Sequence, residues 1–311
     1  MKQTVFSATT TTLGVGASEY YAKQKDMHDD PAKYRGLKFG FPELDKMVGG
    51  ALKKMFIIVA GAPKLGKTTW GIVVAERFAH QVQDNEMVLY ISLEMGVHEI
   101  VSKIIANVGE IEMNKFRDVS LEEKDWVKFA QATDEVSQLP LLVAEGAYTI
   151  EEIEHIVDDY ASKEIKIRAI VLDYFQLMSG DGNGKRWEQL ETLSRGLKQL
   201  AMQKDLSIIA LSQQTKEALQ SVESSKDPLS MAGTQALLRD CDLMMIILPH
   251  KDENSDEEIS FLRDLYVARA RNSQVVDIPI VCTFNGTYCR FGSLADPKKI
   301  PYIDKEPIPN W

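Results

Sequence analysis

The chain has 311 residues, of which 44% are hydrophobic and 26% are charged, and these values exclude a disordered chain and a disulfide scaffold. Its 36 basic and 46 acidic residues give a formal net charge of −10, which excludes binding of nucleic acid through bulk positive charge. No run of about 18 apolar residues is present, so we expect no membrane span. Cys241, Cys282 and Cys289 show no paired spacing, and we interpret them as reduced thiols in the core of a cytoplasmic protein.

Residues 1–35 are interpreted as a flexible N-terminal arm. We expect residues 1–17 to be disordered and residues 18–30 to form one helix that ends before Pro31. A helix with so little apolar surface does not fold alone. The arm is therefore either a loose tail or a linker helix that docks on a neighbouring subunit.

Residues 36–295 have the pattern of an α/β domain, in which short β-branched runs alternate with segments of helical periodicity. Strands are predicted at residues 56–60, 87–92, 139–144, 169–173 and 207–212, and helices after Lys67, at 97–108, from Ser120 to about 137, from Thr149 to about 163 and at 187–203. Ser120 with Glu123 and Thr149 with Glu152 are both predicted to form capping boxes. This alternation predicts βαβ units and a mostly parallel, twisted sheet with helices on both faces.

The end of this domain has a different pattern. Apolar runs at residues 242–248, 265–271 and 278–284 follow one another without helices between them, which predicts an antiparallel edge to the sheet. Residues 296–311 contain four prolines and are predicted to form an extended C-terminal tail.

A phosphate-binding loop is the most specific motif in the sequence. Residues 61–68 read Gly61-Ala62-Pro63-Lys64-Leu65-Gly66-Lys67-Thr68, which matches the Walker A pattern between a predicted strand and a predicted helix. In this motif the loop amides and the helix N-terminus surround phosphates, the lysine reaches the β- and γ-oxygens, and the hydroxyl ligates Mg²⁺. We therefore expect ATP and Mg²⁺ as cofactors, with Thr69 also at the nucleotide.

Two carboxylates are candidates for the remaining parts of a hydrolytic site. Asp173 ends the apolar run 169–173, the Walker B position, and is interpreted as a second ligand of Mg²⁺. Glu94 follows the strand 87–92, which we place next to the strand of the phosphate loop, and is interpreted as the general base. The alternatives are a strand-capping role for Asp173 and a surface position in a turn for Glu94.

The order of the motifs resembles the C-terminal ATPase domain of DnaB-type replicative helicases, in a compact, phage- or plasmid-like form that lacks the N-terminal domain. The resemblance covers most of residues 35–292 and implies a RecA-like fold. The segments that carry it are Gly40-Phe41 to Gly49-Gly50, GAPKLGKTT at 61–69, SLEM at 92–95, LDYFQLM at 172–178, LSRGLKQLA at 193–201, IIALSQ at 208–213, LLRDCDLMMII at 237–247 and ARARN at 268–272.

The resemblance implies roles for three further residues. Gln213 senses the γ-phosphate and links it to DNA-facing loops. Arg271 is an arginine finger that acts on the site of the adjacent subunit, and Arg269 stands beside it where the family has lysine. A finger supplied in this way implies a ring, so we expect a homo-hexamer.

The resemblance also implies that single-stranded DNA contacts the loops 179–187 and 214–235. The candidate DNA-binding residues are Lys185, Arg186, Lys216, Lys226, Gly233 and Thr234. The second loop lacks the Arg-Glu pair of many relatives, so contact there would depend on backbone amides and small polar groups, which bind phosphates without reading sequence.

These observations predict an ATP-dependent hexameric replicative helicase that translocates on single-stranded DNA and unwinds duplex, in the cytoplasm of a bacterium or of a phage-infected cell. A separate primase, a helicase loader or both are expected as partners. Two alternatives remain open. In the first, the chain is a RecA-like recombination ATPase. In the second, it is a helicase-derived loader or inhibitor that joins a ring without translocating.

Overall fold

The computed structural model describes residues 11–30, 34–146, 148–178, 186–214, 239–252, 258–271 and 279–294. The chain divides into two units, residues 1–36 and residues 37–311. In the first unit, helix α1 (Leu13–Asp29) begins at the N-cap Thr12, whose hydroxyl accepts a hydrogen bond from the amide of Val15. No residue of α1 is buried. The expected helix is therefore present, but the expectation that the chain is disordered up to residue 17 was wrong for residues 13–17, because the Thr12 cap starts the helix earlier.

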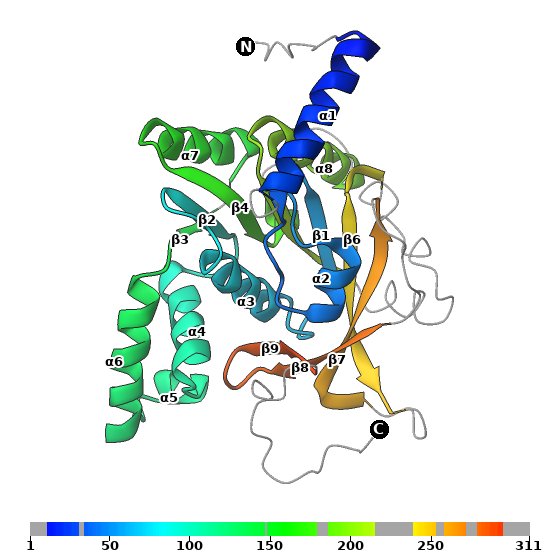
Figure 1. Ribbon diagram of the computed structural model, residues 1–311. Coiled ribbons are helices and arrows are strands. Elements are labelled where there is room, and N and C mark those ends of the chain that lie inside the picture. The colour runs from blue at the N-terminus through cyan, green and yellow to red at the C-terminus, as the bar shows by residue number, and fades with distance from the viewer. Residues whose placement is uncertain are drawn as a thin grey trace. The chain divides into compact units, whose positions relative to one another are not determined.

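The second unit is built on a sheet whose described strands lie in the order β3-β2-β4-β5-β1-β6-β7-β8-β9 (Figure 1). The strands are β1 (Phe56–Gly61), β2 (Glu86–Ser92), β3 (Leu141–Glu145), β4 (Lys166–Asp173), β5 (Ser207–Gln213), β6 (Leu243–Lys251), β7 (Glu258–Ala270), β8 (Ile280–Asn285) and β9 (Arg290–Ser293). In this spatial order, each pair of neighbours from β3 as far as β6 is parallel. Each pair of neighbours from β6 to β9 is antiparallel. The predicted mostly parallel α/β sheet with an antiparallel edge is confirmed.

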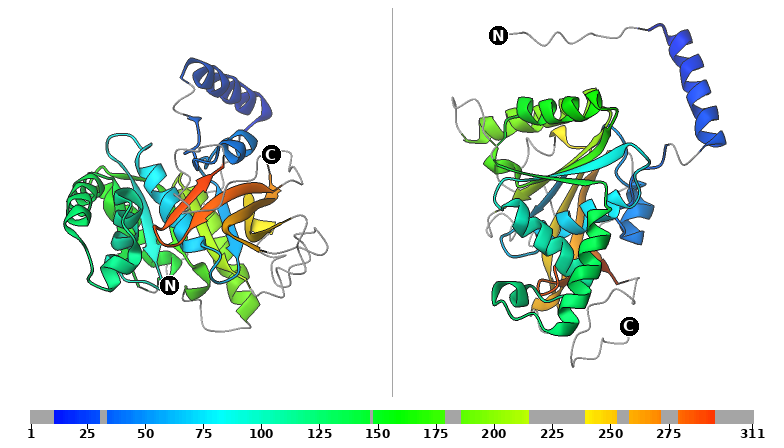
Figure 2. Two further views of the ribbon diagram at one scale, coloured as in Figure 1. Left: turned by 90° about the horizontal axis from the view of Figure 1, so that it is seen from below. Right: turned by 90° about the vertical axis from the view of Figure 1, so that its left-hand side faces the viewer.

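Helices cover both faces of this sheet (Figure 2). Helices α2 (Pro42–Val48), α3 (Lys67–Ala79) and α4 (Val97–Gly109) pack in one core cluster, and α7 (Ile150–Ser162) and α8 (Arg186–Gln203) pack in the other. Every residue of β1 is buried, and alternate residues such as Ile57 and Ile58 belong to the two different clusters. The continuous apolar run at 56–60 follows from this burial on both faces.

The two predicted capping boxes had different outcomes. The box at the start of α7 is confirmed, because the amide of Glu152 donates to the Thr149 hydroxyl at 3.2 Å and the Glu152 carboxylate accepts from the Thr149 amide at 2.8 Å. The predicted Ser120 box was wrong. Glu122 caps α6 (Glu123–Ser137), since the Ser120 amide bonds to the carbonyl of Lys115 and belongs to the turn after α5 (Met113–Arg117).

The predicted position of β2 next to β1 was also wrong. Strand β2, which precedes Glu94, pairs with β3 and β4 rather than with β1. Strands β4 and β5 lie between β2 and β1. The hydrophobic pattern specifies that each run is a buried strand but not which strand lies beside it.

The short elements α2, α5 and β9 were not predicted. Strand β9 has four residues and depends on its pairing with β8, in the register Asn285 to Arg290 and Phe284 to Phe291. All three cysteines are free and buried, as expected. Among the described residues, no helix has the length and apolar character that crossing a membrane requires. The proposed tail, residues 296–311, lies outside the described residues.

Candidate nucleotide-binding site

The loop of residues 61–68 connects the end of β1 to the start of α3, so the predicted strand and helix on either side of the motif are both present. Gly66 caps α3 with φ of 90°, in the left-handed region that favours glycine. A Cβ atom on Gly66 would lie 2.5 Å from the ring of Phe284 in β8. Both the backbone conformation and this close approach therefore require glycine at position 66.

Lys67 is buried, with 8% of its surface exposed. Its Nζ donates a hydrogen bond to the carbonyl oxygen of Ala62 at 2.8 Å, so the ammonium group lies back across the loop. Burial lowers the pKa of Lys67 to about 8, while the negative charges of Asp173 and Glu94 act in the opposite direction. The loop thus holds a desolvated cation, and the two candidate carboxylates are close enough to stabilise it.

Asp173 ends β4 and is 4% exposed. Its carboxylate Oδ2 accepts a hydrogen bond from the hydroxyl of Tyr90 at 2.9 Å. Burial raises the pKa of Asp173, whereas hydrogen bonds from Thr68 and Tyr90 and the charge of Lys67 lower it. The fold therefore brings the Thr68 hydroxyl into contact with the Asp173 carboxylate. Two oxygen donors beside a phosphate loop fit Mg²⁺, which binds through hydroxyl and carboxylate oxygens.

Glu94 lies in the turn after β2, and two hydrogen bonds fix this turn. The amide of Leu93 donates to the carbonyl of Asp173 at 2.7 Å, and the amide of Met95 donates to the Ser92 hydroxyl at 3.0 Å. The Glu94 side chain is exposed, and its charge acts on Lys67 and Asp173. Glu94 therefore belongs to the same site as the phosphate loop, although β2 does not adjoin β1.

Gln213 ends β5, which lies between β4 and β1, and it is paired with Gly61 in the register of the sheet. Gln213 therefore ends the strand that lies beside the strand of Asp173. The backbone amide of Gln213 donates a hydrogen bond to Oε1 of Gln176 at 3.2 Å. Nε2 of Gln176 donates to the backbone carbonyl of Gln213 at 3.0 Å. The end of β5 is thus tied to the segment that follows Asp173.

Comparison with known proteins identifies the family of the chain. The model of the DnaB-like helicase C-terminal domain family matches residues 36–293. The chain belongs to this family. The resemblance inferred from the motifs is confirmed.

The DnaB-like domain is 29% identical over 280 residues to the replicative DNA helicase DnaB of Geobacillus stearothermophilus, and the match covers 86% of this chain and 59% of the relative. It is 26% identical over 275 residues to the replicative DNA helicase DnaC of Bacillus subtilis, with 85% and 59% covered. The chain therefore spans about three fifths of the length of these curated relatives.

Solved structures show the same fold. The ATPase domain of G40P superposes with a TM-score of 0.79 at 23% identity, covering 92% of this chain and 100% of that one. A DnaB-like replicative helicase, described with its interactions with primase, superposes with a TM-score of 0.77 at 23% identity, covering 92% and 68%. The DnaB-like domain is thus a RecA-like α/β domain.

Arg269 and Arg271 of the DnaB-like domain do not lie at the phosphate loop of their own chain. In the sheet, Ala270 is paired with Leu243, and Leu243 is paired with Ile57. Arg271 therefore lies near the start of β1, whereas the phosphate loop follows the end of this strand. Arg269 is paired with Met244. The charges of both arginines act on the buried Cys241 thiol, which places them near the same side chain.

Most of the candidate DNA-binding residues lie outside the described residues. These are Lys185, Lys216, Lys226, Gly233 and Thr234. Arg186 is the first residue of α8, and only its backbone is described.

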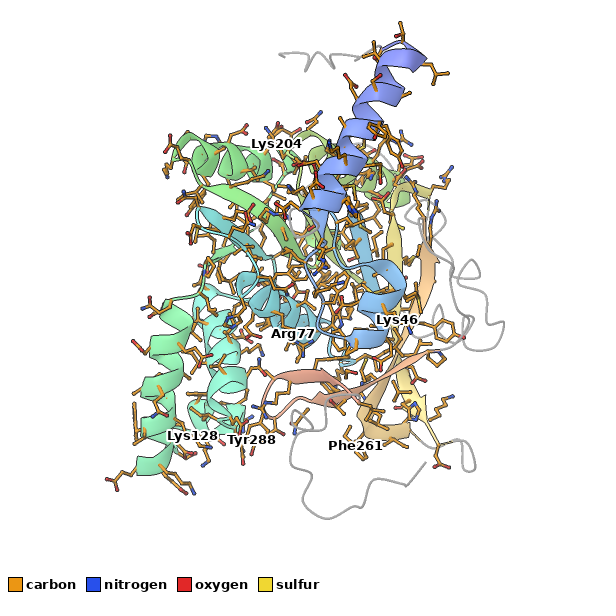
Figure 3. The ribbon with its side chains drawn as sticks, viewed as in Figure 1. Lys46, Arg77, Lys128, Lys204, Phe261 and Tyr288 are labelled. Carbon is orange, nitrogen blue, oxygen red and sulfur yellow. The ribbon has the colours of Figure 1, made fainter. Side chains whose placement is uncertain are left out.

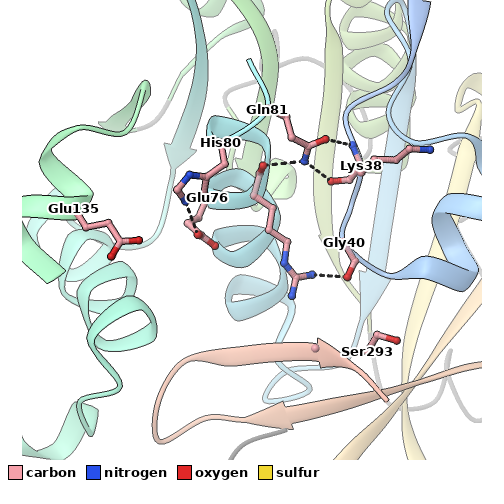
Figure 4. Close-up of a pocket in the computed structure, with 9 residues that line it drawn as sticks. Lys38, Gly40, Glu76, His80, Gln81, Glu135 and Ser293 are labelled. Carbon is pink, nitrogen blue, oxygen red and sulfur yellow. Dashed lines mark hydrogen bonds and ion pairs between the residues drawn. The ribbon is translucent and has the colours of Figure 1, made fainter. Parts of the chain in front are cut away.

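A separate cleft of about 560 Å³ lies between the C-terminal end of α3, the segment before α2 and β9 (Figure 4). Its polar side chains largely pair with one another or with the backbone. Gln81 exchanges two hydrogen bonds with the backbone of Lys38, His80 contacts Glu76 at 3.1 Å, and Arg77 donates to the carbonyl of Gly40 at 3.2 Å. No residue of the phosphate loop lines this cleft, so it is distinct from the nucleotide site.

Three residues of the site were not predicted from the sequence. Ser92 is a polar residue at the end of an apolar strand, and Gln176 is a polar residue between Phe175 and Leu177, and these positions were the available signal. Tyr90 gave no signal, because an aromatic residue inside an apolar strand is usually a core residue.

Proposed function

We propose that the chain is the ATP-hydrolysing motor of a replicative DNA helicase that works as a homo-hexamer on single-stranded DNA. The observation that carries the proposal is the convergence of Lys67, Thr68, Asp173 and Glu94 at the ends of three strands and the start of α3. A buried lysine, a hydroxyl–carboxylate pair and an exposed carboxylate are the groups that phosphoryl transfer to water requires.

Each of these residues has a distinct chemical role in the proposal. The amides of residues 61–69 and the Lys67 ammonium bind the phosphates of ATP, and Thr68 and Asp173 hold Mg²⁺. When bound, Mg²⁺ neutralises negative charge on the phosphate oxygens. Glu94, which is exposed and fixed by the turn after β2, accepts the proton of the attacking water. Gln213 carries the change at the γ-phosphate to the DNA-facing loops.

The position of Arg271 supports an assembly of several copies of the chain. Strand β1 has six residues, which at about 3.3 Å per residue span roughly 17 Å. Since Arg271 lies near the start of β1 and the loop follows its end, the finger would serve the site of a neighbouring subunit, with Arg269 beside it. A finger that acts in this way requires an assembly of copies, and the proposed hexamer supplies it as a closed ring.

The remaining parts of the proposal concern domains, partners and location. Residues 36–295 are the ATPase domain, residues 1–35 an arm and residues 296–311 a tail. Lys185, Arg186, Lys216, Lys226, Gly233 and Thr234 contact the DNA backbone. The names of the relatives, which are bacterial replicative helicases, support action in bacterial cytoplasm or in a phage-infected cell, with a separate primase or loader.

The decisive experiment combines ATPase assays with electron microscopy of the same sample. We expect single-stranded DNA to stimulate ATP hydrolysis, six-fold rings to form, and forked duplex to be unwound with ATP. Open helical filaments would instead favour the recombination ATPase. ATP hydrolysis that does not respond to single strands, without unwinding, would favour the loader or inhibitor.

A further inference from the structure

The hydroxyl of Tyr90 is the only part of that side chain that the hydrophobic core does not need. Tyr90 lies within β2, is 1% exposed and packs in the core cluster that contains Trp70 of α3. A phenylalanine would fill the same space. A buried hydroxyl is costly unless it finds a hydrogen-bond partner, and this one donates to Oδ2 of Asp173 at 2.9 Å.

The register of the sheet explains how the contact arises. Ser92 is paired with Asp173 across β2 and β4, and Tyr90 lies two residues before Ser92, on the same face of β2. A diagonal neighbour of this kind is within reach of a long aromatic side chain. The tyrosine hydroxyl therefore reaches the carboxylate from within the core, while Thr68 contacts it from the phosphate loop.

The contact restrains a torsion that is otherwise soft. The torsion angle that orients a carboxylate has a broad range of allowed values, because it is a rotation about a bond between an sp³ and an sp² carbon. Strand β4 fixes the backbone of Asp173, but only side-chain partners fix the plane of its two oxygens. Among the described partners, Tyr90 belongs to the rigid sheet, whereas Thr68 belongs to the nucleotide-binding segment itself.

We propose that Tyr90 is a positioning residue, which holds the Asp173 carboxylate in the orientation that binds Mg²⁺. The inference rests on the proposed function of Asp173 as a magnesium ligand. It assigns no catalytic step to Tyr90, which acts through Asp173. Outer partners of metal ligands commonly contribute about 10- to 100-fold to metal affinity.

The test is the variant Tyr90→Phe in the full chain, measured by equilibrium binding of a fluorescent ATP analogue. In EDTA we expect the analogue to bind the variant and the wild type equally. In a Mg²⁺ titration we expect the concentration for half-maximal enhancement of binding to rise about tenfold in the variant. A magnesium midpoint equal to that of the wild type would overturn the inference. An equal loss of binding in EDTA and in Mg²⁺ would also overturn it, because that pattern indicates general damage.

Tyr288→Phe is the matched control. The Tyr288 hydroxyl also donates to a carboxylate, Oε1 of Glu112 at 3.1 Å, but it lies in the turn between β8 and β9 (Figure 3). This variant should leave binding of the analogue unchanged both in EDTA and in Mg²⁺. A shift of its magnesium midpoint would show that loss of a tyrosine hydroxyl far from Asp173 also weakens the response to Mg²⁺, and it would overturn the inference.

Asp173→Asn separates failure of the inference from failure of the proposed function. We expect this variant to lose the response to Mg²⁺. If it does while Tyr90→Phe behaves as the wild type, only the role of Tyr90 is wrong. If Asp173→Asn keeps the full response, the magnesium site is wrong, and the role of Tyr90 is wrong with it.

Discussion

Arg271 forms an ion pair with Asp242 beside the start of β1, with 3.3 Å between Nη1 of the guanidinium and Oδ1 of the carboxylate. The other oxygen, Oδ2, accepts hydrogen bonds from the Phe56 amide at 2.8 Å and from Lys198 Nζ at 2.6 Å. Asp242 therefore keeps two donors when Arg271 is absent. The pair holds the guanidinium near one end of β1, while the phosphate loop follows the other end.

The first prediction concerns Arg271→Ala. If the guanidinium acts on a neighbouring site, ATP turnover should fall about 1,000-fold, the usual lower magnitude for an arginine finger, while ATP binding is retained. Turnover and nucleotide affinity, measured on the same preparation, check this expectation. Full turnover would contradict the proposed finger.

A mixing experiment shows whether the finger acts between subunits. Lys67→Ala and Arg271→Ala subunits are each expected to be inactive. Mixed assemblies contain interfaces at which an intact Lys67 meets an intact Arg271, so ATPase activity should reappear. Mixtures that stay as inactive as their components would rule out action between subunits.

The second prediction concerns the stability of the Asp242 cluster. The Asp242 side chain is 11% exposed and has three basic or amide partners, so Asp242→Ala leaves Lys198 and the Phe56 amide without the carboxylate. We expect the free energy of unfolding to fall by about 3 kcal/mol in urea denaturation. Asp159→Ala is the control, since that exposed carboxylate lies 2.7 Å from Lys163 Nζ on the surface of α7 and its loss should lower the free energy of unfolding far less.

The third prediction separates the chemical role of Lys67 from a structural one. Lys67→Ala should abolish ATP hydrolysis, because it removes the ammonium group that the Walker A motif places at the β- and γ-phosphate oxygens. Its melting temperature at pH 7 should not be lower than that of the wild type, since burial disfavours the ammonium and lowers the pKa of Lys67 to about 8. Calorimetry and a turnover assay test both parts, and normal turnover would disprove the site.

The fourth prediction compares two glycines with positive φ. Gly66 and Gly49 have φ of 90° and 77°, but only the Cβ at position 66 would meet another side chain, Phe284 at 2.5 Å. Gly49→Ala should cost about 1 kcal/mol for the left-handed backbone alone. Gly66→Ala should cost more than about 2 kcal/mol and weaken ATP binding. Equal unfolding free energies for the two variants would contradict the close packing of Phe284.

The fifth prediction concerns the cysteines. Burial raises the pKa of Cys241 to about 12 and also raises the pKa of Cys282 and of Cys289. All three thiols stay protonated in the fold at pH 8, so they should react slowly with a disulfide reagent and rapidly after unfolding in guanidinium. Unfolded thiols ionise above about pH 8.5, so the free energy of unfolding should decrease as the pH rises beyond that value. Rapid labelling of the native chain would contradict this burial.

The local features of the site could be predicted from the sequence. The apolar run at 56–60, the glycines of the phosphate loop and the helix period after Lys67 are consecutive in the chain, and short-range sterics and hydrogen bonding determine them. The same is true of the Thr149 cap, whose partners are three residues apart. Asp173 was found because a carboxylate at the end of an apolar strand is costly unless it is used.

The order of the strands was decided only by the tertiary structure. The placement of β2 away from β1, the contact of Tyr90 with Asp173 and the position of Arg271 near the start of β1 all depend on which strands pair and in which register. Apolar patterns record that a residue is buried, whereas long-range packing selects its neighbours. The sequence alone therefore determined the longer helices and strands and the phosphate loop, and the packing of distant segments decided the short elements and which side chains meet at the loop.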